Sequence, residues 1–190
     1  ERVEAAIKSL GYKPNAAARA LSGARPARVV LLYGNPSAAY LAEVLVGAVT
    51  EASESDLQLV VERCRAGVTA GDVTRLVARG NFDGVILPPP FCDSKRIAAA
   101  LLRAGVPTVS IASAAPAVGL FAVMIDDYQA AREMTGRLIE LGHSRIGFIA
   151  GSENQTASAG RLAGYEAALR EKGIAVDHDL IARGDFTYGS

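Results

Sequence analysis

From Arg28 onward, short apolar runs alternate with longer segments in which apolar residues recur every three or four positions. The short runs predict buried strands and the longer segments predict amphipathic helices. The predicted strands are 28–33, 57–64, 82–90, 106–112, 121–127, 144–152 and a weak strand at 179–183. The predicted helices are 40–55, 70–80, 93–105, 128–142 and 158–173. This alternation indicates βαβ units, and therefore an α/β fold with doubly wound parallel sheets and helices on both faces.

The pattern divides into two α/β units. The second begins near residue 126 and has only about two strands before residue 190. We expect it to need further chain to complete its core, and the opening helix pattern begins without a cap. The sequence therefore predicts a segment of a longer protein. Its divisions are an α-helical segment at 1–24, a first unit at 25–126 and an incomplete second unit at 127–190.

Residues 1–24 follow a different pattern from the rest. Helical spacing ends at Gly11, the Tyr12–Asn15 turn follows, and a short alanine-rich helix ends at Gly23. A helix of two turns is marginal alone in water, so we expect it to form only against a partner. Leu21 could wedge between base steps of a DNA minor groove. An ordinary capped helix packed on its own domain is the alternative from the residues alone.

The charged residues are also unevenly distributed along the sequence. The 190 residues have no formal net charge, but residues 1–28 carry six basic and two acidic side chains, a net charge of +4. Within that segment, Lys13 and Arg19 could neutralise DNA phosphates. The charges therefore suggest a basic arm on a mildly acidic body.

Several classes of protein are disfavoured. The two cysteines, Cys64 and Cys92, form neither a CxxC pair nor a disulfide framework, which is typical of the cytoplasm. No apolar run is long enough for a bilayer span, and no signal peptide opens the sequence. It has no nucleophile elbow, metal-ligand cluster or dinucleotide fingerprint, so we expect neither an enzyme nor a bound cofactor or metal. His143 is expected to be a loop residue.

Candidate binding residues lie where strands end, which is the ligand-binding edge of open α/β sheets. Asp126 and Asp127 end one strand, although a helix N-cap is an equal alternative. Arg161 is either a surface charge or a donor fork for ligand oxygens. The other candidates are Asn35 and Tyr40 after the first strand, Asn154 and Gln155 in a polar loop, and Phe186, which could equally be a core aromatic.

Three segments together resemble the LacI/GalR family of bacterial transcriptional regulators. They are the sequence VEAAIKSLGYKPNAAARALSG, the LGHSRI segment and the RLAGY helix. The resemblance identifies residues 1–24 as the end of a helix-turn-helix headpiece with a hinge helix, in which Lys13, Asn15, Ala18, Arg19 and Leu21 contact DNA. It identifies residues 25–126 and 127–190 as the two subdomains of an effector domain of the periplasmic-binding-protein type.

The resemblance implies a mechanism and partners. A small effector, expected to be a sugar, binds between the subdomains through Arg161, with Phe186 stacking on it. The partners are operator DNA and a second copy of the chain, whose contact surface includes residues 40–53. The loop after Asn35 is longer than in common family members. The predicted function is a DNA-binding transcriptional regulator, expected to be a repressor, that is controlled allosterically by the effector. The alternative is a periplasmic-type sugar-binding protein that does not bind DNA.

Overall fold

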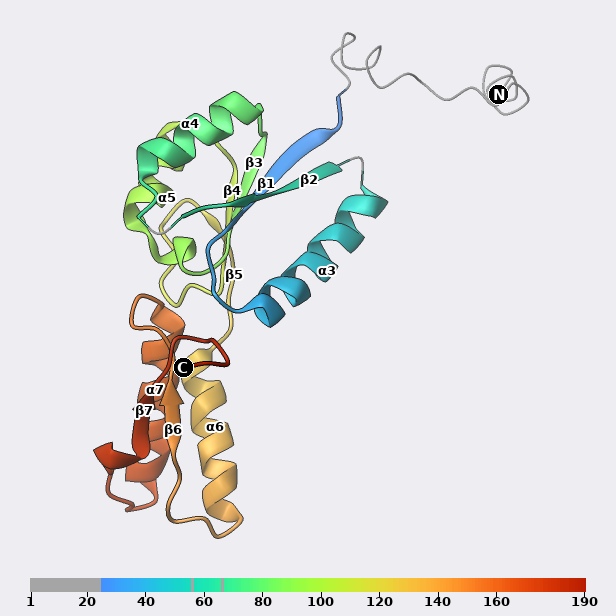
Figure 1. The fold of residues 1–190 in the computed structure, drawn as a ribbon. Helices are drawn as coiled ribbons and strands as arrows, with labels where there is room; N and C mark the ends of the chain where they lie inside the picture. The colour runs from blue at the N-terminus through green and yellow to red at the C-terminus, as the bar shows by residue number, and fades with distance from the viewer. Residues whose placement is uncertain (1–24, 56, 66) are drawn as a thin grey trace, which may run out of the picture.

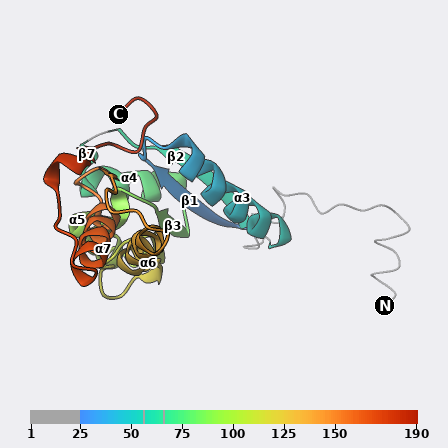
Figure 2. The ribbon, with the colours of Figure 1, turned by 90° about the horizontal axis from the view of Figure 1, so that it is seen from below.

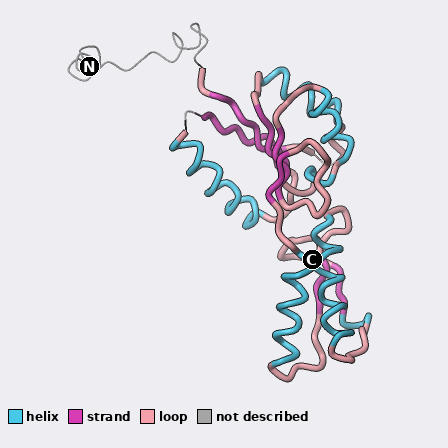
Figure 3. Tube along the Cα trace, turned by 180° about the vertical axis from the view of Figure 1, so that it is seen from behind, coloured by secondary structure: helices cyan, strands magenta, loops and turns pink. Residues whose placement is uncertain are grey.

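The computed structural model describes residues 25–190 except residues 56 and 66. A five-stranded parallel sheet has the order β2-β1-β3-β4-β5 (Figure 1). Its strands are β1 (Ala27–Tyr33), β2 (Leu57–Arg63), β3 (Gly84–Leu87), β4 (Thr108–Ile111) and β5 (Phe121–Val123). Figure 3 shows the strands in magenta and the helices around them in cyan. Every pairing is parallel, and Val30 of the inner strand β1 lies between Val60 and Val85. The parallel α/β sheet predicted from the sequence is confirmed.

Helices cover both faces of this sheet. Figure 1 shows α3 (Ala38–Glu54) on one side and α4 (Ala70–Gly80) with α5 (Lys95–Arg103) on the other. A short 3-10 helix, η1 (Phe91–Asp93), precedes α5. The main core lies under α4 and α5 and contains the buried side chains Val30, Leu32, Val73, Val77, Leu87 and Leu101. In contrast, α3 has no buried residue.

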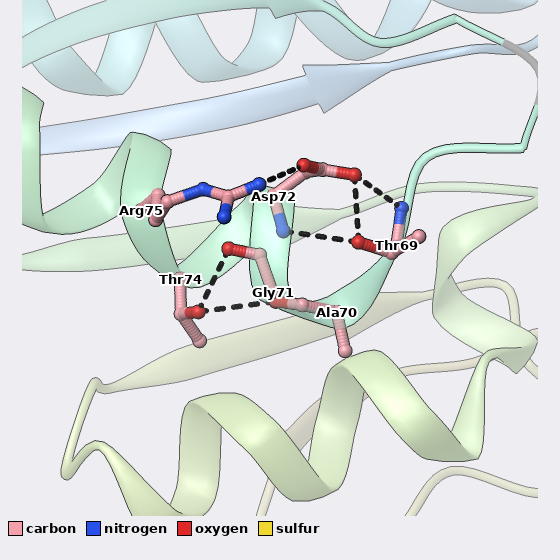
Figure 4. A network of polar contacts seen from close by, with 6 residues as sticks. All are labelled: Thr69, Ala70, Gly71, Asp72, Thr74 and Arg75. Carbon is pink, nitrogen blue, oxygen red and sulfur yellow. Dashed lines mark hydrogen bonds and ion pairs between the residues drawn. The ribbon is translucent and has the colours of Figure 1, made fainter.

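The start of α4 shows why the sequence places a helix there (Figure 4). The Thr69 hydroxyl accepts a hydrogen bond from the Asp72 amide at 3.2 Å, and the Asp72 carboxylate accepts one from the Thr69 amide at 3.0 Å. This reciprocal capping box satisfies amides that the helix leaves unpaired. Hydrogen bonds from Thr69, with a further bond from Arg75, lower the pKa of Asp72. The helix ends at Asn81, whose φ of 48° is left-handed.

The entry of the chain into β1 is held by Asp83, in the turn between α4 and β3. Its carboxylate accepts the Arg28 backbone amide at 2.8 Å and the Arg25 guanidinium at 2.6 Å. The hydrogen bond from the Arg28 backbone is the largest cause of a lowered pKa at Asp83. The Arg28 guanidinium lies 5.0 Å from the centre of the Phe82 ring. Residues 25–28 are therefore fixed against the body of the protein.

The second unit is smaller. It contains α6 (Asp127–Glu140), α7 (Thr156–Glu171), the short helix η2 (His178–Leu180) and a parallel pair of strands, β6 (Phe148–Ala150) and β7 (Ile181–Arg183). Figure 2 shows α6 and α7 side by side. A small core forms where Tyr165 stacks on Phe148, with ring centres 4.9 Å apart.

The two helices of this unit approach closely because α7 has a glycine at the contact. A Cβ atom on Gly164 would lie 2.1 Å from the carbonyl oxygen of Tyr128, well inside contact distance. Farther along the same helix pair, the Arg132 guanidinium bonds both carboxylate oxygens of Glu171, at 2.8 and 2.9 Å. The spacing of α6 and α7 is thus set by backbone contact and fixed by a bidentate ion pair.

Some predicted boundaries are wrong. The predicted strand 82–90 ends at Leu87, because Pro88–Pro90 have no amide hydrogen for the sheet. The predicted strand 144–152 is reduced to 148–150, since its partner β7 has three residues. The predicted strand 121–127 ends at Val123, and Asp127 already begins α6.

The predictions made for residues 1–24, including the hinge residues Lys13, Asn15, Ala18, Arg19 and Leu21, lie outside the described residues. Among the residues that are described, no helix has the length and apolar character required to cross a membrane.

Candidate functional site

The first part of the site is the loop between β1 and α3. Asn35 is buried, and its side-chain oxygen accepts the Ser37 amide at 2.8 Å. Ser37 in turn caps α3, since its hydroxyl accepts the Tyr40 amide at 3.2 Å. Asn35 therefore shapes the loop, which places the half-buried Tyr40 in the first turn of α3.

The two neighbouring carboxylates at the start of α6 have different environments. Asp126 is exposed and caps the helix, accepting the Gln129 amide at 2.9 Å. Asp127 is buried, and its carboxylate accepts a hydrogen bond from Nε of Arg161 at 2.7 Å. Asp126 is therefore the N-cap of α6, which was one of the two alternatives from the sequence. Asp127 instead forms an ion pair with Arg161.

The start of α7 holds three further candidates. Asn154 is exposed and accepts a hydrogen bond from the Ser152 hydroxyl at 2.8 Å. Gln155 is buried and precedes the helix, but its side chain makes no capping bond. Arg161 lies one and a half turns into α7 with its side chain 45% exposed, so its guanidinium is paired yet accessible.

Phe186 lies next to Arg161. The guanidinium carbon of Arg161 is 6.0 Å from the centre of the Phe186 ring. A Cβ atom on Gly151 would lie 2.0 Å from the ring, so the glycine makes room for the aromatic side chain. Phe186 has a left-handed φ of 67°, an uncommon conformation for a bulky residue. The backbone is therefore held in an unfavourable conformation that sets the ring beside Arg161.

Tyr40, in the first unit, is affected by charges of the second unit. Burial raises the pKa of its phenol, and the charges that act on it include Arg161 and Asp127 of the second unit. Burial also raises the pKa of the neighbouring Cys92 thiol to about 12, so this thiol is uncharged at neutral pH. Tyr40, Asp127, Arg161 and Phe186, here called the junction cluster, thus come from both sides of the boundary between the two units.

The structure adds three residues that the sequence did not single out. The Asp93 carboxylate accepts the Ser113 hydroxyl at 2.7 Å, and the Thr156 hydroxyl and amide at 2.8 and 2.9 Å. Asp93 therefore caps α7 from the other unit. The sequence assigned residue 93 to a helix, but Ser94 caps α5 and Asp93 ends η1. The sequence feature that could have identified Asp93 is its position soon after a strand, like that of Asp126.

His143 lies in the exposed turn after α6, where its amide donates to the Leu138 carbonyl at 3.2 Å. Within residues 25–190, apart from 56 and 66, no group of three metal-ligating side chains is present. A hollow of about 800 Å³ lies along α7 and β7, and it shares only Asn154 with the predicted binding residues. The candidate binding site is therefore the junction cluster, which combines a charged pair, an aromatic ring and a phenol hydroxyl.

Comparisons with known proteins show the family of the chain. Residues 27–189 match the family described as periplasmic binding proteins and sugar binding domain of LacI family. The chain is 36% identical to the HTH-type transcriptional regulator CelR of Thermobifida fusca, covering 100% of this chain and 58% of that protein. It is 32% identical to the HTH-type transcriptional repressor CytR of Escherichia coli K12, covering 98% and 55% respectively.

Solved structures give the same result. The transcriptional regulator CelR in complex with cellobiose has a TM-score of 0.74 and 33% identity, covering 99% of this chain and 57% of that chain. The transcriptional repressor ascG of Escherichia coli has a TM-score of 0.70 and 26% identity, covering 85% and 60%. The chain thus spans a little more than half the length of the relatives that it matches.

Proposed function

The chain belongs to the LacI family of transcriptional regulators, and from that premise we propose that the protein is a DNA-binding repressor whose operator affinity is controlled by a bound sugar. The observation that best supports this proposal is the arrangement of the junction cluster. Arg161, held by Asp127 at 2.7 Å, lies beside the Phe186 ring at the boundary between the two units. A guanidinium fork beside an aromatic ring suits a sugar, which offers hydroxyl groups and an apolar face.

The proposed organisation has three parts. Residues 1–24 form the end of a helix-turn-helix headpiece and the hinge, 25–126 the first effector subdomain, and 127–190 the beginning of the second. The sugar binds between the subdomains and shifts their closure, which alters the paired hinge helices on operator DNA. Because binding linkage is reciprocal, operator DNA must change the affinity for the sugar by the same factor.

The alternative functions predict different sequence features and different kinds of related proteins. A periplasmic-type sugar-binding protein would share the effector fold but not the basic segment of residues 1–28. The relatives described above are named transcriptional regulators and not enzymes or transport proteins, which favours regulation in the cytoplasm. We include cellobiose among the candidate ligands because it is bound in the related CelR structure.

The experiment that tests the function is a thermal-melt screen of the intact natural protein against glucose, cellobiose, maltose, purines and nucleosides. A ligand at about 100 times its Kd should stabilise the native state by about 2.7 kcal/mol. The same ligand should change the affinity for a DNA fragment containing the operator, measured by fluorescence anisotropy. Stabilisation by no sugar, or a sugar that leaves DNA affinity unchanged, would contradict the proposal.

We also propose that the protein is a homodimer whose contact includes α3. This helix has no buried residue, although it is rich in apolar side chains, and Val46 and Val49 are 65% and 54% exposed. Exposed apolar side chains on one face mark association surfaces. A second copy is the partner that the symmetry of most oligomers favours.

Substituting Val46 and Val49 together by aspartate should therefore dissociate the dimer, because two carboxylates would have to be buried without partners. Sedimentation equilibrium should show the dissociation constant rising at least about a hundredfold. Val118→Asp, in a loop where the valine is 96% exposed, adds the same chemistry elsewhere and should leave the dimer intact. An unchanged dimer in the double variant would exclude α3 from the interface.

A further inference from the structure

The groups around the junction cluster that could attract an anion are each already paired with a carboxylate. Three such groups come together there: the N-terminus of α6, the N-terminus of α7 and the guanidinium of Arg161. Helix N-termini carry partial positive charge and commonly bind phosphates. The protein groups that already neutralise these three positive groups therefore determine which class of sugar the site accepts.

Both helix ends are occupied. Asp126 accepts the Gln129 amide in the first turn of α6 at 2.9 Å. Asp93 accepts the Thr156 amide, the first of α7, at 2.9 Å, and its other oxygen accepts the Thr156 hydroxyl. A phosphate at either helix end would have to displace or lie beside a carboxylate of the same charge sign.

Arg161 is likewise neutralised. Asp127 is only 6% exposed, and its ion pair uses Nε of the guanidinium. Within the described part of the chain, the two terminal amino groups of Arg161 have no protein acceptor. The pair thus presents two N–H donor groups with little net charge. Such a fork can bond neutral hydroxyl oxygens, while the nearby carboxylate opposes a dianion.

The helix packing fixes this pairing. A Cβ on Gly160 would lie 3.4 Å from the Asp127 Cβ, and one on Gly164 would meet the Tyr128 carbonyl. The close approach of α6 and α7 therefore places Arg161 directly opposite Asp127. Tyr40 and Cys92 add no charge at neutral pH, because burial raises the pKa of the Tyr40 phenol and raises the pKa of the Cys92 thiol to about 12.

We infer that Asp127 is a positioning residue that acts through Arg161, and that the paired arrangement selects uncharged sugars over their phosphate esters. The inference rests on the proposed function, since it describes the ligand of the same site. Asp127 does two things in this arrangement. It orients the fork, and it supplies the negative charge that disfavours a phosphate.

The test is calorimetric titration of the intact natural protein with glucose, cellobiose and their 6-phosphates. In the wild type, the neutral sugar that binds should do so at least about tenfold more tightly than its phosphate ester. Asp127→Asn keeps the shape but removes the charge. It should weaken binding of the neutral sugar and reduce the preference over the phosphate about tenfold, with a phosphate affinity that falls as salt is added.

Glu171→Gln is the matched control, because Glu171 pairs with Arg132 across the same two helices, away from the junction. It should leave the neutral-to-phosphate ratio unchanged, which separates the charge effect from a general loosening of α6 and α7. The wild-type ratio also tests the inference without any substitution. A wild type that prefers the phosphate, or an unchanged ratio in folded Asp127→Asn, would overturn the inference while leaving sugar binding intact. A wild type that binds no sugar would overturn the proposed function and this inference together.

Discussion

Replacing Arg161 by alanine should reduce sugar affinity about a hundredfold and abolish the sugar's effect on operator binding. Among the described residues the two terminal amino groups of Arg161 have no protein acceptor, and they are the donors that we propose for the ligand. A hydrogen bond from a charged group contributes about 1.5–3 kcal/mol. Two such bonds therefore correspond to a hundredfold or more in Kd. The substitution also removes the 2.7 Å partner of the buried Asp127, so the ligand-free protein should be less stable.

Titration calorimetry and operator anisotropy measure the two effects separately. Arg132→Ala is the control, since it removes an arginine–carboxylate pair between the same helices that lies outside the junction cluster. It should lower stability slightly and leave sugar affinity unchanged. If Arg161→Ala kept the wild-type sugar affinity, the proposed role of the junction cluster would be wrong. If the sugar still changed the operator affinity of this variant, the sugar would have to bind elsewhere.

Replacing Gly164 by alanine should destabilise the protein by about 2–3 kcal/mol, an effect typical of overpacking. The added methyl group would lie 2.1 Å from the Tyr128 carbonyl and 3.0 Å from the Arg132 amide. These are backbone atoms, which cannot turn aside as a flexible side chain can. The helices would have to separate, and the Arg161–Asp127 pair between them should lengthen. Urea denaturation measures the loss of stability.

Gly136→Ala provides the comparison for this effect. Gly136 lies in α6, and a Cβ there would have no neighbour within 4 Å. Alanine should stabilise a helix relative to glycine by up to about 1 kcal/mol. The same substitution should therefore have opposite signs in the two adjacent helices. Equal midpoints for both variants would show that α6 and α7 are not held at the described distance.

The periodic pattern was sufficient to predict the parallel sheet and the helix order. Continuous apolar runs such as Val29–Leu32 are typical of strands buried on both faces. β1 is indeed an inner strand, and its consecutive residues Val30–Leu32 are buried. Boundaries were less predictable where a partner strand limits the pairing, as at β6, which has only three residues to pair with β7. The length of a strand depends on its neighbour, which a local pattern does not contain.

The candidate site was predicted unevenly. Arg161 and Asp127 were both named, but the sequence does not say that they contact each other, because they are 34 positions apart. Nor does it separate the roles of Asp126 and Asp127, because the sequence does not show which of the two carboxylates faces α7. Asp93 was missed because its bond to Thr156 joins residues 63 positions apart, and a lone aspartate before a helix resembles a local cap.

The cap that Asp93 provides to α7 has a consequence for the biosynthesis of the protein. On the ribosome, Asp93 emerges 63 residues before Thr156, so the first sheet can form before α7 is complete. The amino end of α7 then finds its acceptor on a surface that already exists. Translation from the N-terminus thus suits this chain, and a circularly permuted gene that placed residues 127–190 first would have to synthesise α7 before its cap.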